Sequence, residues 1–305
     1  MLFYTIKRFG LASLVALTVS FISFGLLYLS SDPAIAMAGE TASDADIEAI
    51  RKLYGFDRPI LVQYFDWLMR AMGGDLGKSY YFRNDVSALI GERLPTTMML
   101  GVSAISFAII FSVPLGVAAA IRPNSIIDRV ALFLSVMGQA LPSFWFALML
   151  IVFLSVNLRL LPTSGSDSWQ HFVMPTVVLG YYAAPAIMRL TRTGMLEVLS
   201  TDYIRTARAK GLQPTIVLFK HALRNAIIPV VSLAAVQFGF MLGGSIVVET
   251  IFALHGAGFL AWESITRNDL PTVQGLILVF SLFYIVLTFL ADLLNAWLDP
   301  RIRIN

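Results

Sequence analysis

Six apolar runs without a single charged residue dominate this sequence of 305 residues. A helix needs about 20 apolar residues to cross the ~30 Å hydrocarbon core of a bilayer, and five of the runs meet that length. The fourth run has 17 residues and two prolines, but the charges of its flanking loops require a span there. We therefore predict an all-α polytopic membrane protein with six transmembrane helices over residues 9–29, 97–121, 130–158, 172–188, 225–248 and 270–291.

Composition agrees with this fold class, because 57% of the residues are hydrophobic and only 13% are charged, whereas soluble domains carry about 25% charged residues. The sequence has no cysteine, which excludes disulfides and thiolate chemistry. Its three histidines, at 171, 221 and 255, lack the spacing of metal ligands, so we expect no metal site. The net charge of +3 is divided among short loops, so we expect no nucleic-acid partner.

Lysine and arginine gather in alternate loops. The loop after the fourth run holds seven basic residues against Glu197 and Asp202, whereas the loops with Arg159 and Arg267 hold one each. The excess of basic residues on the cytoplasmic side of membrane proteins predicts that both termini are cytoplasmic. Asp292, near the inner end of the last run, is expected to lie at the interface or to pair with a basic residue.

Residues 31–94 predict a small helical cap on the extracytoplasmic side. Ser43 and Asp46 have the spacing of a capping box, and Gly55 suits the end of the helix that follows. A second helix is expected to begin with Pro59 in its first turn. The cap either packs on the membrane helices or offers a docking surface.

The end of the cap resembles a nucleotide site without being one. Gly77-Lys78-Ser79 matches the end of a P-loop, but that motif needs a glycine at position 72, where the sequence has Met72. A further short helix is predicted over 85–92, leading through Pro95 into the second span. We expect no nucleotide and no cofactor to bind this chain.

The inner loop over 199–229 predicts two short helices. Asp202 favours the start of the first, whose contact face carries Ile204, Thr206 and Ala207, and Gly211 ends it. The second begins at Pro214, with an apolar face formed by Ile216, Phe219, Leu223 and Ile227 and a basic face formed by Lys220 and Arg224. This pattern indicates a cytoplasmic protrusion with a basic rim. Such helices also bind anionic membrane lipid at headgroup level, which is the alternative.

The stretch "DYIRTARAKGLQPTIVLFKHALRNAIIP" resembles the EAA-type coupling motif of ABC importer permeases. The stretches "GSIVVETIFALHGAGFLAWESITRNDLPTVQG", "LLNAWLDPRIR", "GDLGKS", "ERLPTTMMLG" and "DRPILVQYFDWL" are similar to the first, B-type membrane subunit of the dipeptide/oligopeptide/nickel permease family. The sequence departs from the motif at Thr206-Ala207-Arg208, which lacks the acidic first residue. It also has Ser30-Ser31 where the family usually has Pro-Gly.

This resemblance implies a type I importer in the bacterial inner membrane. The chain would be a non-catalytic subunit, and its partners would be a paralogous C-type permease subunit, two cytoplasmic ATPases that hold ATP and magnesium, and an extracytoplasmic substrate-binding protein. Expected segments are 1–30, the cap 31–94, the transport domain 95–296 with its coupling loop 191–228, and a cytoplasmic tail 297–305. The implied ATPase-coupling residues are Asp202, Arg205, Ala207, Gly211, Leu218, Phe219, His221 and Arg224.

Polar residues inside the apolar runs are candidates for the translocation pathway, because such groups usually face a bundle interior or a cavity. These are Gln139, Gln237, Gln274, Ser232 and Ser245. Each of them serves equally well as a hydrogen bond between helices. By resemblance, Glu249, His255 and Glu263 are candidates for an outer gate.

Two other classes compete with the importer. A stand-alone secondary transporter or channel predicts carboxylates within the membrane, and the six runs contain none. A membrane enzyme needs clustered catalytic groups, which the sequence does not offer. Di- and oligopeptides are the expected cargo, with a nickel chelate, glutathione, an opine or an oligosaccharide as alternatives.

Overall fold

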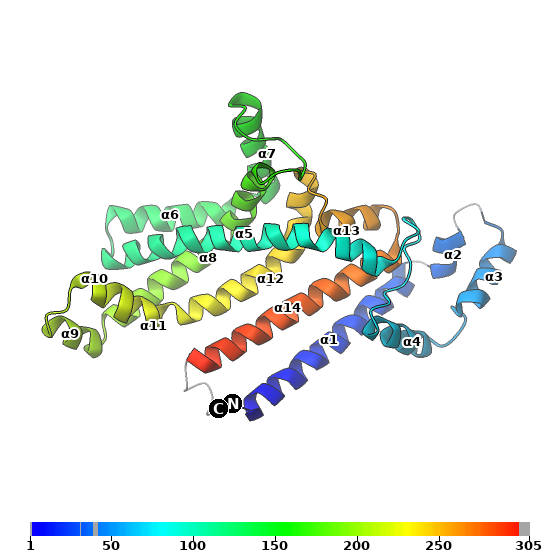
Figure 1. Ribbon diagram of the computed structural model, residues 1–305, viewed down its shortest axis with the longest axis horizontal. Coiled ribbons are helices and arrows are strands. Elements are labelled where there is room, and N and C mark those ends of the chain that lie inside the picture. Colours follow the sequence, from blue (N-terminus) through cyan, green and yellow to red (C-terminus); the bar gives the residue numbers. More distant parts are fainter. Residues whose placement is uncertain (1, 31, 39–41, 299–305) are drawn as a thin grey trace.

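The computed structural model describes residues 2–30, 32–38 and 42–298, and all regular elements in this part of the chain are helices. Five are long and apolar enough to span a membrane: α1 (Leu2–Ser30), α5 (Val86–Ile121), α8 (Gln170–Leu199), α12 (Ile228–Ile251) and α14 (Leu270–Leu298). They run side by side along the molecule (Figure 1). The all-helical fold is thereby confirmed. Arg301 and Arg303 of the expected tail lie outside the described residues.

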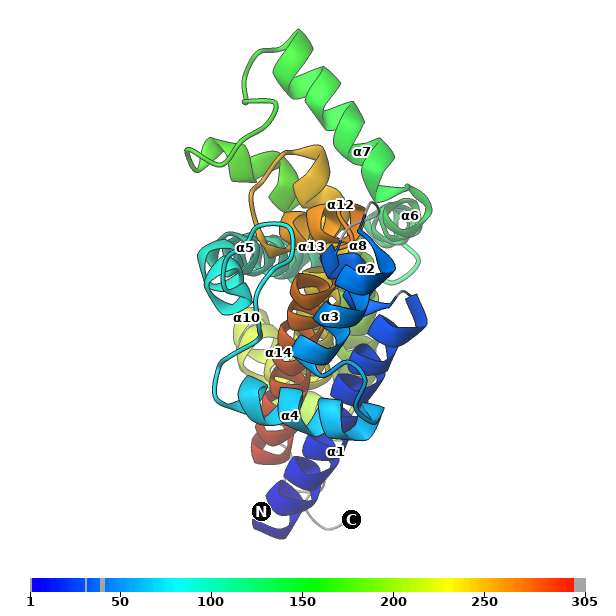
Figure 2. The same ribbon diagram turned by 90° about the vertical axis from the view of Figure 1, so that its right-hand side faces the viewer.

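The predicted third span is not one straight helix. Residues 130–158 fall on α6 (Ile126–Ala140), α7 (Ser143–Leu150) and the π-helix η1 (Ile151–Asn157), and the chain bends by 103° between α6 and α7. The break is at Leu141, which is extended, and Pro142, which has no amide hydrogen to continue a helix. As a result, α7 and η1 run in a different direction from the long helices (Figure 2). The count reaches six spans only if this bent pair is one of them.

Two helix boundaries also differ from the predictions. Residues 85–92 do not form a separate helix, because α5 begins at Val86 and continues through Pro95. Val86 and Ile90 pack with Leu260 and Leu276 in one apolar cluster, and this packing compensates for the hydrogen bond that proline removes. The fourth span is longer than 172–188, since α8 continues to Leu199 with two prolines inside it.

Small residues allow the central helices to approach closely. A Cβ atom on Gly180 of α8 would lie 2.6 Å from the carbonyl oxygen of Ala104 on α5. One on Gly239 of α12 would lie 2.3 Å from the ring of Tyr284 on α14. By contrast, no described atom lies within 4 Å of a Cβ built on Gly243 or Gly244. Helix α12 is therefore closely packed against α14 at Gly239 and open at Gly243 and Gly244.

Alanine substitutions at Gly180 and Gly243 are expected to distinguish the effect of helix packing on stability from the effect of helix propensity. Gly180→Ala should destabilise the protein by about 1–3 kcal/mol, because the new methyl group meets backbone that cannot turn away. Gly243→Ala is the matched control, and it should be neutral or stabilising by up to ~1 kcal/mol. The measurement is the thermal midpoint of each variant in mild detergent. Equal midpoints for the two variants would contradict the close α5–α8 crossing.

The cap consists of α2 (Pro33–Ala38), α3 (Asp44–Tyr54) and α4 (Ile60–Met72). The predicted capping box is confirmed, since Asp46 N donates to Ser43 Oγ at 3.3 Å and Ser43 N to Asp46 Oδ2 at 3.4 Å. Gly55 ends α3 with φ of 69°. Pro59 is the N-cap of α4 rather than a residue of its first turn.

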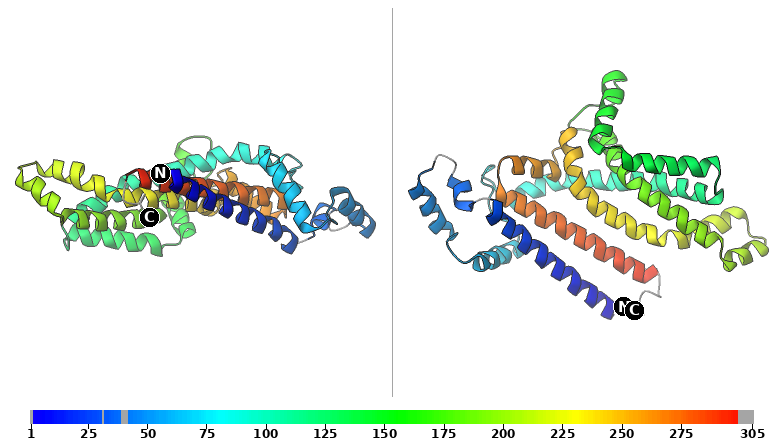
Figure 3. Two further views of the ribbon diagram at one scale, coloured as in Figure 1. Left: turned by 90° about the horizontal axis from the view of Figure 1, so that it is seen from below. Right: turned by 180° about the vertical axis from the view of Figure 1, so that it is seen from behind.

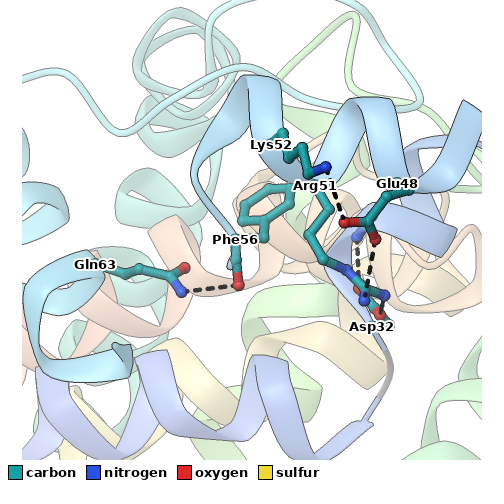
Figure 4. Close-up of polar contacts among 7 residues, drawn as sticks. Asp32, Glu48, Arg51, Lys52, Phe56 and Gln63 are labelled. Carbon is teal, nitrogen blue, oxygen red and sulfur yellow. Dashed lines mark hydrogen bonds and ion pairs between the residues drawn. The ribbon is translucent and has the colours of Figure 1, made fainter. Parts of the chain in front are cut away.

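Polar contacts hold the three cap helices together (Figure 4). The Arg51 guanidinium pairs with Asp32, just before α2, and lies 3.6 Å from Glu48. Gln63 Nε2 on α4 donates to the Phe56 carbonyl oxygen at 3.2 Å and to that of Arg58 at 2.7 Å. The cap is therefore a folded unit rather than a linker.

The first and last long helices lie together. Arg8 Nη1 of α1 is 2.9 Å from Asp292 Oδ2 of α14, which confirms the expected basic partner of Asp292. The start of α1 and the end of α14 lie on the side of the molecule toward α9 (Asp202–Ala209), and the cap lies at the opposite end (Figure 3).

Candidate functional site: the protrusion, the open helix face and the buried carboxylates

The protrusion projects from one end of the bundle and contains α9, α10 (Pro214–Ile216), the π-helix η2 (Val217–Leu223) and α11 (Arg224–Ala226) (Figure 1). Its buried side chains form one cluster with the ends of α5 and α8. The members are Val117, Ala120, Met195, Ile204, Ala207, Val217, Ala222 and Ala226. The protrusion is thus packed against the ends of α5 and α8.

Gly211 forms the open tip between the two halves of the protrusion. Its φ is +76°, which agrees with the predicted helix stop. Among the described residues, no atom lies within 4 Å of a Cβ built there. Asp202 and Arg205 are exposed on α9 and pair with each other at 3.0 Å.

The predicted faces of the two short helices are partly wrong. Thr206 is exposed, and its hydroxyl only donates to the Asp202 carbonyl at 3.0 Å. Ile216 and Phe219 are exposed, whereas Val217 and Ala222 are buried. For the second helix the cause is η2, since a π-turn takes more residues than the α-helical period that the prediction assumed. Phe219 thereby becomes a large apolar side chain at the surface, 58% exposed.

The eight predicted coupling residues all lie on this protrusion. Asp202, Arg205, Gly211, Phe219 and Arg224 are exposed, Leu218 and His221 are half-buried, and Ala207 is buried. The His221 carbonyl accepts from Tyr203 Oη at 3.4 Å, and Asn225 Nδ2 donates to the same Tyr203 oxygen at 2.8 Å. These bonds join α9 to the second half of the protrusion.

A cavity of about 510 Å³ opens between α7, α8 and α12. Most of its lining is apolar, including the exposed rings of Tyr182 and Phe240, and Gly244 forms part of the wall. Gln237 is the one predicted pathway residue that lines it. Tyr182, Phe240 and Val247 are exposed here, whereas other lining residues such as Val178 and Val248 are buried.

The other four predicted pathway residues do not join Gln237 at this cavity. Gln139 is exposed near the end of α6, beside the bend. Gln274 is buried in α14, and its Nε2 has no hydrogen-bond partner in the described part of the chain; the same holds for Ser232 Oγ. Ser245 is buried and donates to the Leu242 carbonyl at 2.9 Å.

Glu249 is fully buried at the end of α12 and holds the start of α13 (Ala257–Thr266). Its Oε2 accepts from the amide of Phe259 at 2.8 Å, and its Oε1 accepts from Thr97 Oγ1 at 2.7 Å. Thr97 Oγ1 accepts in turn from the amide of Ala257 at 2.8 Å. The N-cap of α13 is Gly256, which has no side chain, so Glu249 and Thr97 satisfy two amides that a capping side chain would otherwise take.

The three predicted gate residues are not one group. His255 is exposed and Glu263 is half-buried. In the residues that the structure describes, no hydrogen bond or ion pair joins either of them to Glu249. Only Glu249 is built into a polar network.

The P-loop-like stretch has a structural explanation. Ser79 Oγ donates to Asp269 Oδ2 at 2.6 Å, and the amide of Tyr80 donates to Asp269 Oδ1 at 2.9 Å. Thr272 Oγ1 also donates to Asp269 Oδ2 at 2.6 Å. Asp269 is fully buried just before α14. The stretch thus ties the cap to the loop between α13 and α14.

Sequence reasoning missed a buried ion pair between α6 and α8. Arg192 Nε donates to Asp128 Oδ1 at 2.6 Å, and Arg192 Nη2 donates to Asp128 Oδ2 at 2.8 Å. The amide of Asn124 also donates to Asp128 Oδ2 at 2.9 Å. The partners are 64 residues apart, so no local pattern could reveal them.

Breaking this pair is expected to weaken the end of the bundle next to the protrusion. Asp128→Ala should destabilise the protein by about 3–5 kcal/mol, because Arg192 is left partly buried without its partner. Arg192→Lys should also destabilise it, since an ammonium group cannot form the two parallel bonds. The thermal midpoint of the purified transporter measures both effects. Arg205→Ala is the control, because its pair with Asp202 is exposed and contributes little.

Long apolar helices, the ordered protrusion and the exposed stretch of α12 at Gly243 and Gly244 define a polytopic membrane protein. Two family models match the sequence. Residues 1–101 match the N-terminal model of the binding-protein-dependent transport system membrane component, and residues 112–304 match the model of the inner membrane component of the same systems. The chain belongs to the binding-protein-dependent transport system inner membrane component family. It is therefore a permease subunit of an ABC importer in the inner membrane.

The chain is also similar to glutathione permeases of Escherichia coli and Salmonella. The chain is 40% identical to the glutathione transport system permease protein GsiC of Escherichia coli strain K12, and the match covers 99% of each chain. It is 40% identical, with the same coverage, to GsiC of Salmonella typhimurium strain LT2. Among solved structures, it is similar to the MetNI methionine ABC transporter in an inward-facing conformation. That match has a TM-score of 0.57 and 22% identity and covers 69% of this chain and 96% of the other, so it shows the fold alone.

Proposed function

We propose that this permease imports short peptides of about the size of glutathione, as one of two membrane subunits of the importer. The observation that carries the proposal is the 40% identity to glutathione permeases over 99% of both chains. Glutathione is itself a tripeptide, so this cargo agrees with the di- and oligopeptides that the resemblance implied.

The open face beside the cavity is proposed as half of the translocation pathway. Gly243 and Gly244 face open space, and Phe240 and Val247 are exposed beside them. A second, C-type permease subunit would cover this face and complete the passage. Gln237 would then present an amide to the peptide backbone of the cargo, while the apolar wall accepts varied side chains.

The protrusion is proposed as the contact with the ATPases. Phe219 and Ile216 are exposed apolar side chains next to the basic Lys220 and Arg224, which suits a partner surface rather than bulk water. This assignment places the protrusion and both chain termini in the cytoplasm, and the cap outside, where a substrate-binding protein delivers the cargo. ATP binding by the partners would move α5 and α8 through the buried cluster of the protrusion.

Uptake by the purified complex tests the cargo. The chain is produced with its co-encoded permease, ATPases and binding protein and reconstituted in vesicles that enclose ATP, so that the binding protein is added outside. We expect ATP-dependent accumulation of radiolabelled glutathione and competition by unlabelled di- and tripeptides. A nickel chelate, an opine and an oligosaccharide should not compete. Uptake of one of these three without any uptake of peptides would overturn the proposed cargo.

A further inference from the structure

Helix α4 carries a broad apolar face that no other described element covers. Its members are Leu61, Val62, Phe65, Met69 and Met72, and their side chains are between 43% and 68% exposed. At 3.6 residues per turn, these five positions share a face about 100° wide. Exposure to water of five large apolar side chains on one face of a 13-residue helix is unfavourable, so this face is expected to be covered.

The remaining faces of α4 have clear roles. Tyr64 and Trp67 are buried, and they pack against Phe24 of α1 and Leu278 of α14. Asp66 is exposed and pairs with Arg58 at 2.7 Å, and Arg70 is exposed nearby on the same edge. The helix thus has a packed face, a narrow polar edge and the uncovered apolar face.

The contacts of Tyr64 fix the depth of α4 relative to the membrane helices. Tyr64 Oη lies 2.8 Å from Ser20 Oγ and donates to the Leu17 carbonyl at 3.4 Å. The first apolar run extends to Leu29, so Ser20 lies nine residues inside it, or about 14 Å along the helix at ~1.5 Å per residue. Leu278 lies eight residues after the start of α14 at Leu270, or about 12 Å. Helix α4 is therefore level with the spanning helices rather than above them.

The apolar face of α4 also continues the exposed apolar surface of α1. Phe21 of α1 is exposed, and its ring meets the Tyr64 ring edge-on at 5.1 Å. The Tyr64 ring is 5.6 Å from that of Phe65. Figure 2 shows α4 lying across α1 at the cap end of the molecule.

We propose that α4 is an interfacial helix whose uncovered face is embedded among lipid acyl chains of the leaflet on the cap side. Interfacial helices bury their apolar face about 5–10 Å below the headgroups. The contacts of Tyr64 and Trp67 hold α4 below the ends of the apolar runs of α1 and α14, as such burial requires. Asp66 and Arg70 then reach the headgroup region, and the lipid anchors the cap. The inference requires only the membrane spans, whereas the identity of the leaflet follows from the proposed orientation.

Site-directed spin labelling tests this proposal, because the chain has no cysteine of its own. Phe65→Cys and Met72→Cys place a nitroxide on the apolar face, and Arg70→Cys places one on the polar edge of the same helix. The full chain is studied in its transporter complex, with cysteine-free partners, in vesicles of phosphatidylethanolamine and phosphatidylglycerol. Variants that retain uptake are compared by the relaxation of the label with oxygen, which concentrates in the bilayer, and with a water-soluble nickel chelate.

We expect labels at positions 65 and 72 to be several-fold more accessible to oxygen than to the nickel chelate, and the label at position 70 to show the reverse. Equal accessibility at positions 65 and 70 would overturn the proposal. It would also fail if position 65 were open to the nickel chelate in vesicles and became protected only after the binding protein was added, since the face would then dock a protein. Because uptake is measured separately, the proposed cargo can fail while this inference stands.

Discussion

Glu249→Leu is expected to lower the free energy of unfolding by roughly 2–6 kcal/mol and to abolish uptake. The substitution leaves the Phe259 amide and the Thr97 hydroxyl buried without their acceptor, and each such group costs about 1–3 kcal/mol. Helix α13 would lose its attachment to α5 and α12 because its own N-cap is a glycine. The thermal midpoint of the assembled transporter in detergent measures the loss.

Further variants test whether the loss of stability comes from the hydrogen-bond network of Glu249 and Thr97. Glu249→Gln keeps an acceptor for the Phe259 amide and should be less destabilising than Glu249→Leu. Thr97→Val combined with Glu249→Leu should destabilise less than the sum of the single variants, because the two side chains share one network. Glu263→Gln on α13 is the control and should leave the midpoint unchanged. An unchanged midpoint for Glu249→Leu would contradict the capping role.

Gly211→Glu is expected to leave the chain in the membrane while separating ATP hydrolysis from uptake. The open tip has room for a side chain, so the membrane helices should keep their packing. At φ of +76° a residue other than glycine costs about 1–2 kcal/mol locally. We expect uptake per ATP hydrolysed to fall about tenfold or more.

A smaller substitution at Gly211 distinguishes the effect of the backbone conformation from the effect of blocking the ATPase contact. Gly211→Asn retains access to the left-handed conformation and adds no charge, so it should lose less uptake than Gly211→Glu. Uptake, ATP hydrolysis and recovery of the ATPases with the tagged chain are measured together. Full coupling in Gly211→Glu would exclude the tip from the ATPase contact. Loss of the chain from the membrane would mean that the tip is required for folding.

Local chemistry in the sequence was sufficient for several elements. The capping box at Ser43 and Asp46 and the helix stops at Gly55 and Gly211 were predicted and confirmed, because each depends on a few neighbouring residues. The predicted buried face of the second short helix was wrong, since no local sequence pattern indicates the π-turn over Val217–Leu223. Of the pathway candidates, only Gln237 lines the cavity, because a polar residue within an apolar run does not reveal which way its helix is turned.

The sequence by itself determined that this protein is a bundle of membrane-spanning helices with a helical protrusion after the fourth apolar run and a helical segment between the first two runs. It did so because the length of an apolar run, the sorting of basic residues between loops and the residues at helix ends act over short stretches of chain. Only the tertiary structure decided that the third span bends by 103° and that Glu249 holds the start of α13. The same is true of the ties between Asp269 and Ser79 and between Asp128 and Arg192. Each of these ties joins side chains that are far apart in sequence and meet only when the helices pack.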